Sequence, residues 1–318
     1  MNDKIAGKFR GTGVKAGLMY GMAEFYGGGA FVIINTFFLV FLTKALGMPA
    51  ALAGAIPMVG KVWDAITDPM MGNITDRTSS RFGPKRLYIL IGGILSAIAF
   101  VSLWTTIPSR STTVQFIYYI VMYCLFSTCF TIIMVPYNGL LPDMVDSYDI
   151  RSKFSSLRMI WSTVGAILAG LVPTLMIKDT LNTSMYLKVA IIFGILFGFA
   201  AVVTFMGTWE KVKPPVKTKL RDSFSEASSV LRSRSFKIFI GIYLSGQCAM
   251  DFVSGMAIYY VDDVLGGYDK GYLTMLMGVL LSSQLIGMLI FTPIMTRTSK
   301  RTTILIGAPI RLASTLGL

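Results

Sequence analysis

The sequence predicts an all-α polytopic membrane protein, and three observations support this fold class. Of its 318 residues, 54% are hydrophobic and only 14% are charged, whereas water-soluble domains carry about 25% charged residues. The apolar residues form runs of the length that a helix needs to cross the ~30 Å hydrocarbon core of a bilayer. The net charge is +13, but the basic residues lie between the apolar runs and form no basic domain, which argues against a nucleic-acid partner.

The apolar runs place nine expected spans along the chain. Each is expected to be a helix, because backbone amides in lipid must form their hydrogen bonds within the segment. The first run has no small-residue cleavage site, so it is expected to be a retained span and no signal peptide. The ninth run is cut off by the last residue. The runs centre on residues 17–43, 50–74, 87–107, 114–141, 155–177, 186–208, 236–262, 272–295 and 303–318.

A polar segment divides the spans into two groups. We expect an N-terminal six-helix bundle at 1–208, a cytoplasmic linker at 209–235 and the start of a C-terminal bundle at 236–318. The linker contains Lys211–Lys219, which has two prolines and four lysines, a composition typical of linkers. This layout is typical of transporters built from two parallel repeats.

A short internal repeat supports a duplicated architecture. The sequence RTSSR at 77–81 follows the second span, and RTSKR at 297–301 follows the eighth. These are equivalent positions in two six-helix halves. On this interpretation the second half is incomplete in this chain and stops in its third span.

Basic residues in the loops predict the orientation. One side of the predicted topology carries 21 lysines and arginines and the other carries five. Because the basic side faces the cytoplasm, we expect a multi-pass protein of the plasma (inner) membrane with a cytoplasmic N-terminus. The same residues are expected to contact lipid headgroups.

The most informative ionisable cluster lies in the second span. Asp64 and Asp68 are four residues apart, so both carboxylates project from one helix face. Lys61 supplies one positive charge, which leaves the cluster at −1, and a single Na⁺ or H⁺ would neutralise it. Hard cations bind oxygen ligands, and Thr67 offers a hydroxyl. The alternative is a structural ion pair between Lys61 and one of the two aspartates.

Other polar residues in the spans are weaker candidates for substrate binding. Glu24 precedes three glycines that include Gly28, a pattern that permits either close helix packing or a ligand beside the backbone. The fifth span contains an arginine that could face a cavity or extend to the interface. Asp251 lies near a glutamine in the seventh span, and Tyr26 could stack on a ligand or pack in the core.

A charged turn joins the second and third spans. Asp76, Arg77 and Arg81 lie there, and an aspartate beside arginines near a helix end suits a breakable ion-pair latch between two halves that rock. A second cluster, Asp143–Arg151, follows the fourth span. Either could instead be an ordinary solvated loop.

The sequence shows no recognisable set of catalytic residues. The sequence contains no histidine, and no nucleophile paired with a base or cofactor motif is recognisable. The three cysteines show no metal-type spacing and lie inside apolar runs. We therefore expect no enzyme and no cofactor.

Three segments resemble the glycoside–pentoside–hexuronide:cation symporters, a group of the major facilitator superfamily that includes the bacterial melibiose permeases. These segments are Trp63–Gly72, the charged turn that ends at Arg86, and the stretch from Pro136 to Arg158. The resemblance implies a major facilitator-type fold with twelve spans in a full member. It also implies that a coupling cation binds Asp64 and Asp68.

The resemblance assigns further roles. It implies that Thr67 is a neighbouring polar ligand, that the Thr131 hydroxyl faces the same cation site, and that Arg158 helps to bind sugar. Lys61 stands where the group has another basic residue, and we expect it, like Arg158, to take part in substrate binding. Gly28 and Met134 stand where members have acidic residues, and this loss suits an anionic substrate such as a uronide.

These features lead to one functional expectation with two rivals. We expect a monomeric secondary active transporter that moves a sugar or glycoside, a small-molecule solute, together with Na⁺ or H⁺. The first rival is a cation-coupled carrier of lysolipid or another solute. The second is a membrane receptor or assembly partner that does not transport.

Overall fold

The structure is a computed structural model that describes residues 13–109, 111–210 and 233–264, with isolated positions between 271 and 309. The chain divides into two units, Met1–Leu273 and Thr274–Leu318. Every helix named below lies in the first unit. Most of the predicted linker, much of the predicted eighth and ninth spans, and the second copy of the internal repeat lie outside the described residues.

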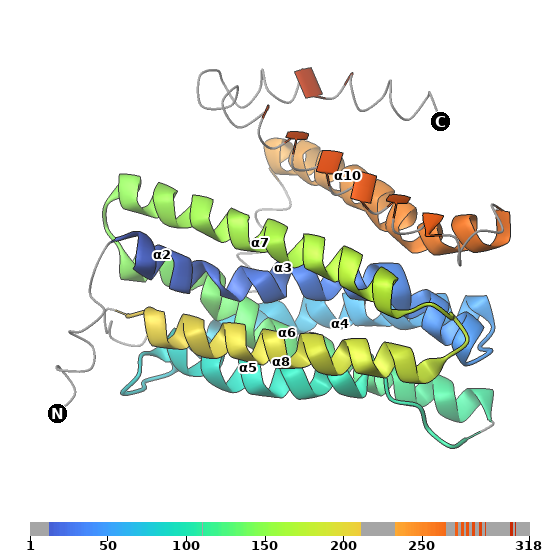
Figure 1. Cartoon of the computed structure of the whole chain (residues 1–318). Helices are drawn as coiled ribbons and strands as arrows, with labels where there is room; N and C mark the ends of the chain where they lie inside the picture. The colour runs from blue at the N-terminus through green and yellow to red at the C-terminus, as the bar shows by residue number, and fades with distance from the viewer. Residues whose placement is uncertain are drawn as a thin grey trace. The chain divides into compact units, whose positions relative to one another are not determined.

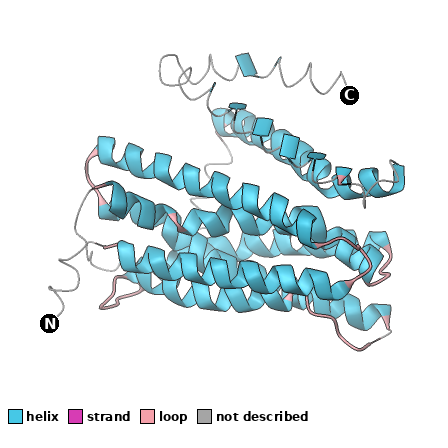
Figure 2. Ribbon diagram, viewed as in Figure 1, coloured by secondary structure: helices cyan, strands magenta, loops and turns pink. Residues whose placement is uncertain are grey.

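The described part of the first unit is helical and contains no strand (Figures 1 and 2). The first span is built from two α-helices that continue into two π-helical turns, and the seventh also ends in a π-helical turn. The elements are α2 (Val14–Gly21), α3 (Ala23–Ile33), η1 (Ile34–Phe38), η2 (Phe41–Ala45), α4 (Ala50–Arg77), α5 (Pro84–Ser102), α6 (Thr112–Met144), α7 (Tyr148–Met176), α8 (Thr183–Gly207), α10 (Arg234–Tyr259) and η3 (Tyr260–Val264).

These helices correspond to the first seven predicted spans. Six helical segments among the described residues are long and apolar enough to cross a membrane. The helix α4 is 28 residues long, or about 42 Å at 1.5 Å per residue, but its charged residues lower its hydropathy. The sequence misplaced some ends: Asp143 lies inside α6, and α7 already begins at Tyr148. The segment predicted as a loop after the fourth span is therefore mostly helical.

Small residues bring α3 and α7 together. A Cβ atom on Gly28 would lie 2.5 Å from the backbone oxygen of Ser162, and one on Gly165 would overlap the backbone of Phe25. Glycine at these positions allows the two backbones to approach closely, as is typical of helix contacts in membranes. The close approach fixes which side chains of the two helices face each other.

Aromatic side chains fill the centre of the bundle near the end of the first span. Phe38 and Phe41 pack against Trp104, with ring centroids 5.6 Å and 5.4 Å apart. Tyr186 stacks on the same indole at 5.9 Å. Such buried aromatic pairs each contribute about 0.5–1.5 kcal/mol beyond their area, and they join the first span to α5 and α8.

Candidate functional site

Two carboxylates of α4 face two hydroxyls of α6. The Ser127 hydroxyl donates to Oδ1 of Asp64, and the Thr131 hydroxyl donates to Oδ1 of Asp68 over 2.7 Å. The acids are four residues apart on α4 and the hydroxyls are four residues apart on α6, so the two contacts lie on successive turns of both helices. The sequence did not single out Ser127, although its spacing from Thr131 could have done so.

Neither carboxylate of this α4 pair forms an ion pair with a lysine or arginine among the residues that the structure describes. The alternative interpretation, in which Lys61 neutralises Asp64 or Asp68, is not what the structure shows. Lys61 Nζ instead lies 2.8 Å from Oδ2 of Asp251 on α10. The two carboxylates therefore keep acceptor oxygens that hydroxyl donors alone do not neutralise.

Two contacts next to this pair hold α4 against α6. Trp63 Nε1 donates to Oγ1 of Thr128 over 2.8 Å. Gly60 faces the Tyr123 ring so closely that a Cβ atom there would overlap it. Thr67, predicted as a further ligand, donates its hydroxyl to the carbonyl oxygen of Trp63 over 3.2 Å, along α4 itself.

The oxygen-rich composition of this cluster limits which cations it suits. The described residues contain no group of three or more histidine, cysteine, aspartate or glutamate side chains that could hold a metal ion. Two carboxylates and two hydroxyls are hard oxygen donors, which suit Na⁺ or a proton better than a transition metal.

A second polar cluster joins α3, α6 and α7. Glu24 and Arg158 form an ion pair, with Arg158 Nε 2.6 Å from Oε1 of Glu24. Arg158 Nη2 donates to Oδ1 of Asn138 over 2.5 Å, and its guanidinium lies 4.8 Å from the centroid of the Tyr137 ring. The sequence predicted that Glu24 and Arg158 bind substrate separately, and the structure brings them together. It did not single out Asn138.

The structure places Gly28 one helical turn from this ion pair. Gly28 faces Ser162, just as Glu24, four residues earlier, faces Arg158. The two contacts are successive turns of the α3–α7 interface. The acidic side chain that the resemblance expects at Gly28 is therefore replaced by one a single turn away on the same helix face.

Tyr26 lies in the core. Its hydroxyl bonds to the hydroxyl of Ser96 on α5, and its ring packs between Phe130 and Phe197 at 5.1 Å and 5.0 Å. Only 2% of its surface is exposed. The structure thus brings Tyr26 into helix packing and does not bring it to the Glu24–Arg158 pair.

Asp251 receives three hydrogen bonds from three elements. Its Oδ1 accepts from Nδ2 of Asn35 over 3.1 Å and from Nε2 of Gln247 over 3.2 Å. Its Oδ2 accepts from Lys61. The aspartate therefore joins η1 and α4 to α10, and both of its oxygens are occupied.

The predicted latch residues lie at the C-terminal end of α4, where Asp76 and Arg77 are the last two residues, and in the turn to α5, which contains Arg81. Asp76, Arg77 and Arg81 are all exposed, and the Arg81 guanidinium lies 4.7 Å from the ring centroid of the neighbouring Phe82. Their role between two halves stays a prediction.

A buried ion pair beside that turn ties α5 to α6. Lys85 pairs with Asp143 and also donates to the carbonyl oxygen of Gly139 over 2.8 Å. Glu210, which follows α8, accepts from the backbone N–H of Lys85 over 3.0 Å and from that of Arg86 over 3.5 Å. Burial raises the pKa of the Glu210 carboxyl, and the two N–H donors offset part of this rise. This cluster holds three helices of the N-terminal bundle.

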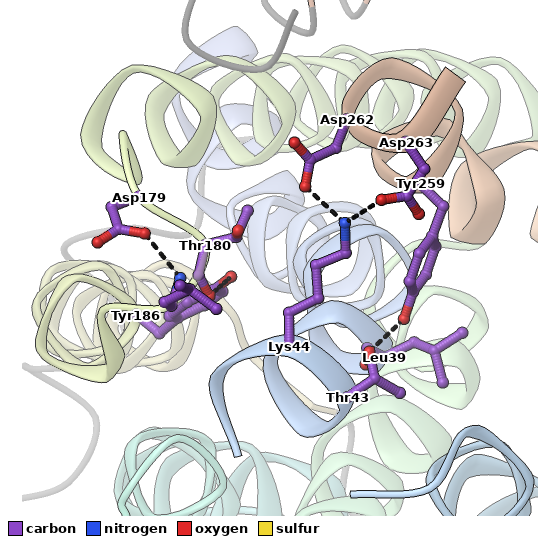
Figure 3. Close-up of polar contacts among 10 residues, drawn as sticks. Leu39, Thr43, Lys44, Asp179, Thr180, Tyr186, Tyr259, Asp262 and Asp263 are labelled. Atoms are coloured by element: carbon purple, nitrogen blue, oxygen red, sulfur yellow. Dashed lines mark hydrogen bonds and ion pairs between the residues drawn. The ribbon is translucent and has the colours of Figure 1, made fainter. Parts of the chain in front are cut away.

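At the opposite end of the bundle, Lys44 links the first span to the end of the seventh. Its Nζ lies 2.5 Å from Oδ2 of Asp262 and 2.8 Å from Oδ1 of Asp263, as Figure 3 shows. The Tyr259 and Thr43 hydroxyls bond beside it at 2.5 Å. The sequence did not single out this contact, although two adjacent aspartates at one span end and a lysine at another could have indicated it.

Comparison with known proteins decides the family. A model of the MFS/sugar transport protein family matches residues 19–318. The chain belongs to this family. Membership confirms the predicted major facilitator-type, all-helical membrane fold and the interpretation of the chain as a transport protein and not an enzyme. It also confirms the suspected relationship to cation-coupled sugar symporters at the level of the family.

Three relatives illustrate the range of this family. An uncharacterized symporter of Synechocystis sp. is 38% identical over 158 residues, or 48% of this chain and 29% of the relative. The isoprimeverose transporter of Lactiplantibacillus pentosus is 25% identical over 64% of this chain and 44% of its own length. The sodium-dependent lysophosphatidylcholine symporter 1 of Gallus gallus is 30% identical over 42% of this chain and 25% of its own length. The chain spans less than half the length of each of these relatives.

Proposed function

We propose that the protein is a secondary active transporter that moves a sugar or glycoside together with Na⁺ or H⁺. The observation that carries this proposal is the α4 carboxylate pair. Asp64 and Asp68 receive hydrogen bonds from hydroxyls of α6 and form no ion pair with a described lysine or arginine. Two adjacent carboxylates repel each other in a low-dielectric setting, so a mobile cation between them stabilises the site.

The second cluster supports a sugar-like substrate. Glu24, Asn138 and Arg158 bring together an anionic acceptor, an amide and a planar donor. The Tyr137 ring beside them offers an apolar surface. Sugars present hydroxyls around an apolar ring face, and convergent polar groups next to an aromatic side chain suit such a ligand. A relative named an isoprimeverose transporter adds weight to this class.

The ion pairs favour a neutral glycoside over a uronide. An anionic substrate requires an available cationic side chain, but Arg158 is already paired with Glu24 and Lys61 with Asp251. A uronide carboxylate would have to displace an internal carboxylate that is held at short range. The loss of acidic residues at Gly28 and Met134 is therefore offset by Glu24, one turn from Gly28.

Transport would follow from linkage between the two clusters. If the cation stabilises the state with higher affinity for substrate, the substrate tightens cation binding by the same factor. A membrane potential of 100 mV adds about 2.3 kcal/mol per charge, which supports roughly fifty-fold accumulation. We propose that the N-terminus faces the cytoplasm of the cell whose plasma membrane holds the protein.

The experiment that tests the proposal measures uptake driven by an imposed cation gradient. We expect Asp64→Asn and Asp68→Asn each to lower gradient-driven uptake of radiolabelled glycosides at least about 100-fold, with protein still present in the membrane. Asp179→Asn, which changes an exposed acid after α7, is the matched control and should retain uptake. Unchanged coupled uptake in both α4 variants would refute the cation site.

A counterflow assay separates the rival functions. In proteoliposomes, a carrier exchanges external labelled substrate for internal unlabelled substrate without a gradient, whereas a receptor does not. We expect counterflow with neutral glycosides, and none with lysophosphatidylcholine or glucuronides. Counterflow with lysophosphatidylcholine alone would instead favour the lysolipid carrier.

A further inference from the structure

Lys61 lies near two carboxylates, those of Asp64 and Asp251. It precedes Asp64 by three residues on α4, a separation at which helix side chains meet. In the structure it contacts Asp251 of α10 over 2.8 Å. Its side chain is 65% exposed, and a lysine ammonium sits on a flexible four-carbon stem. A turn of this stem is enough to bring the charge to Asp64.

A lysine placed on Asp64 would have the same charge as the coupling cation. The two negative charges of Asp64 and Asp68 attract a monovalent cation, and each fixed positive charge brought to them weakens this attraction. An ammonium within ion-pair distance of Asp64 would compensate one of the two negative charges and compete with Na⁺ or H⁺ for that carboxylate. A residue that holds Lys61 away from Asp64 therefore affects the affinity of the site for the cation.

Asp251 is built to hold that lysine. Asn35 and Gln247 both donate to Oδ1 and so fix the carboxylate, while Oδ2 faces Lys61. The side chain of Asp251 is 24% exposed and that of Lys61 is 65% exposed, so geometry, more than burial, holds the pair. The two fixing amides come from η1 and from α10 itself.

We propose that Asp251 is a positioning residue that diverts Lys61 from Asp64 and thereby keeps the α4 carboxylates open to the transported cation. This inference rests on the proposed function. It also gives a physical link between the seventh span and the cation site: a movement of α10 away from α4 breaks the Lys61–Asp251 contact, and the freed ammonium then competes with the bound cation. Release of the cation would accompany that movement.

The test measures the apparent cation affinity of purified protein by thermal stabilisation. NaCl is titrated at pH 8 with choline chloride to keep ionic strength constant, and protons are titrated without Na⁺. We expect Asp251→Asn to raise the half-maximal cation concentration at least about tenfold. Lys61→Gln alone should keep or improve the affinity of the wild type. The double variant Lys61→Gln/Asp251→Asn should recover it, because the competing ammonium is gone.

The rescue distinguishes positioning from a merely structural role. A local unfolding caused by Asp251→Asn would not be repaired by removing Lys61. Asp262→Asn, which removes one of the two ion pairs of Lys44, is the matched control and should leave cation affinity unchanged. The inference is overturned if Asp251→Asn binds the cation like the wild type, or if the double variant binds as weakly as Asp251→Asn.

The same assay separates this inference from the proposed function. If Asp64→Asn keeps the cation-dependent stabilisation, the proposed cation site itself is wrong. If Asp64→Asn abolishes the stabilisation while Asp251→Asn leaves it intact, the cation site stands and only the role of Asp251 fails.

Discussion

The α4–α6 and α3–α7 helix pairs both carry acidic side chains at the helix contact, but they compensate these acids differently. Glu24 on α3 meets a fixed arginine, Arg158 on α7. Among the described residues, Asp64 and Asp68 on α4 accept hydrogen bonds from hydroxyls of α6 and form no ion pair with a lysine or arginine. A fixed cation makes an acid part of the permanent structure, whereas hydroxyls orient an acid without neutralising it. The difference identifies which carboxylates remain available for a charge from solution.

The comparison predicts different effects on stability when one charge is removed from each cluster. Arg158→Met leaves Glu24 without its ion-pair partner, and breaking a buried pair in this way costs about 3–5 kcal/mol. Asp68→Asn removes a like-charge repulsion, so in cation-free buffer it should not lower the unfolding temperature. Thermal unfolding of purified protein without Na⁺ at pH 8 measures both. Equal destabilisation by the two variants would contradict the difference between the acid paired with arginine and the acids bound by hydroxyls.

A smaller effect is expected from the packing that brings Glu24 and Arg158 together. Gly165→Ala forces a Cβ atom against the backbone of Phe25, and overpacking of this kind typically costs about 1–3 kcal/mol. Because it pushes α3 from α7, it should also weaken glycoside binding, with cation affinity retained. Gly54→Ala is the matched control, since a Cβ atom there meets nothing within 4 Å. Identical behaviour of the two variants would contradict the role of the α3–α7 contact.

The smallest expected effect concerns Glu210 beside the α4–α5 turn. Its pKa is raised from 4.5 by burial, so folding favours its protonated form. The stability that this protonated form contributes is complete below pH 4.5 and is lost as the pH rises through the higher folded pKa. The unfolding temperature of the wild type relative to Glu210→Gln should therefore fall as the pH is raised from 4 to 7. A difference that stays constant or grows would show that the carboxyl is not destabilised by burial.

The sequence predicted the first seven spans, which correspond to described helices, because hydropathy and length determine them directly. It also predicted that Asp64 and Asp68 share a face, since a spacing of four residues requires it. It could not predict that Lys61 contacts Asp251, because the two residues are 190 positions apart and depend on how α10 rotates against α4. The Glu24–Arg158 pair, 134 positions apart, escaped prediction for the same reason.

Helical geometry explains why Tyr26 packs in the core and does not lie beside Glu24. It is two residues from Glu24, which turns it about 200° around the helix axis at 3.6 residues per turn. It therefore points to α5 while Glu24 points to α7. Gly28 is four residues from Glu24 and shares its face. The sequence left open whether Tyr26 and Gly28 lie near a ligand or pack against other helices, and the periodicity of the helix places them on different faces.

Direct cation binding is the measurement that tests the central idea most closely. Purified protein is equilibrated with ²²Na⁺ at pH 8, and proton binding is followed by acid–base titration without Na⁺. We predict one monovalent cation bound by the wild type, as Na⁺ or as H⁺, and none at that site in the Asp64→Asn/Asp68→Asn double variant. A double variant that binds the same cation with the same stoichiometry and affinity would contradict the account.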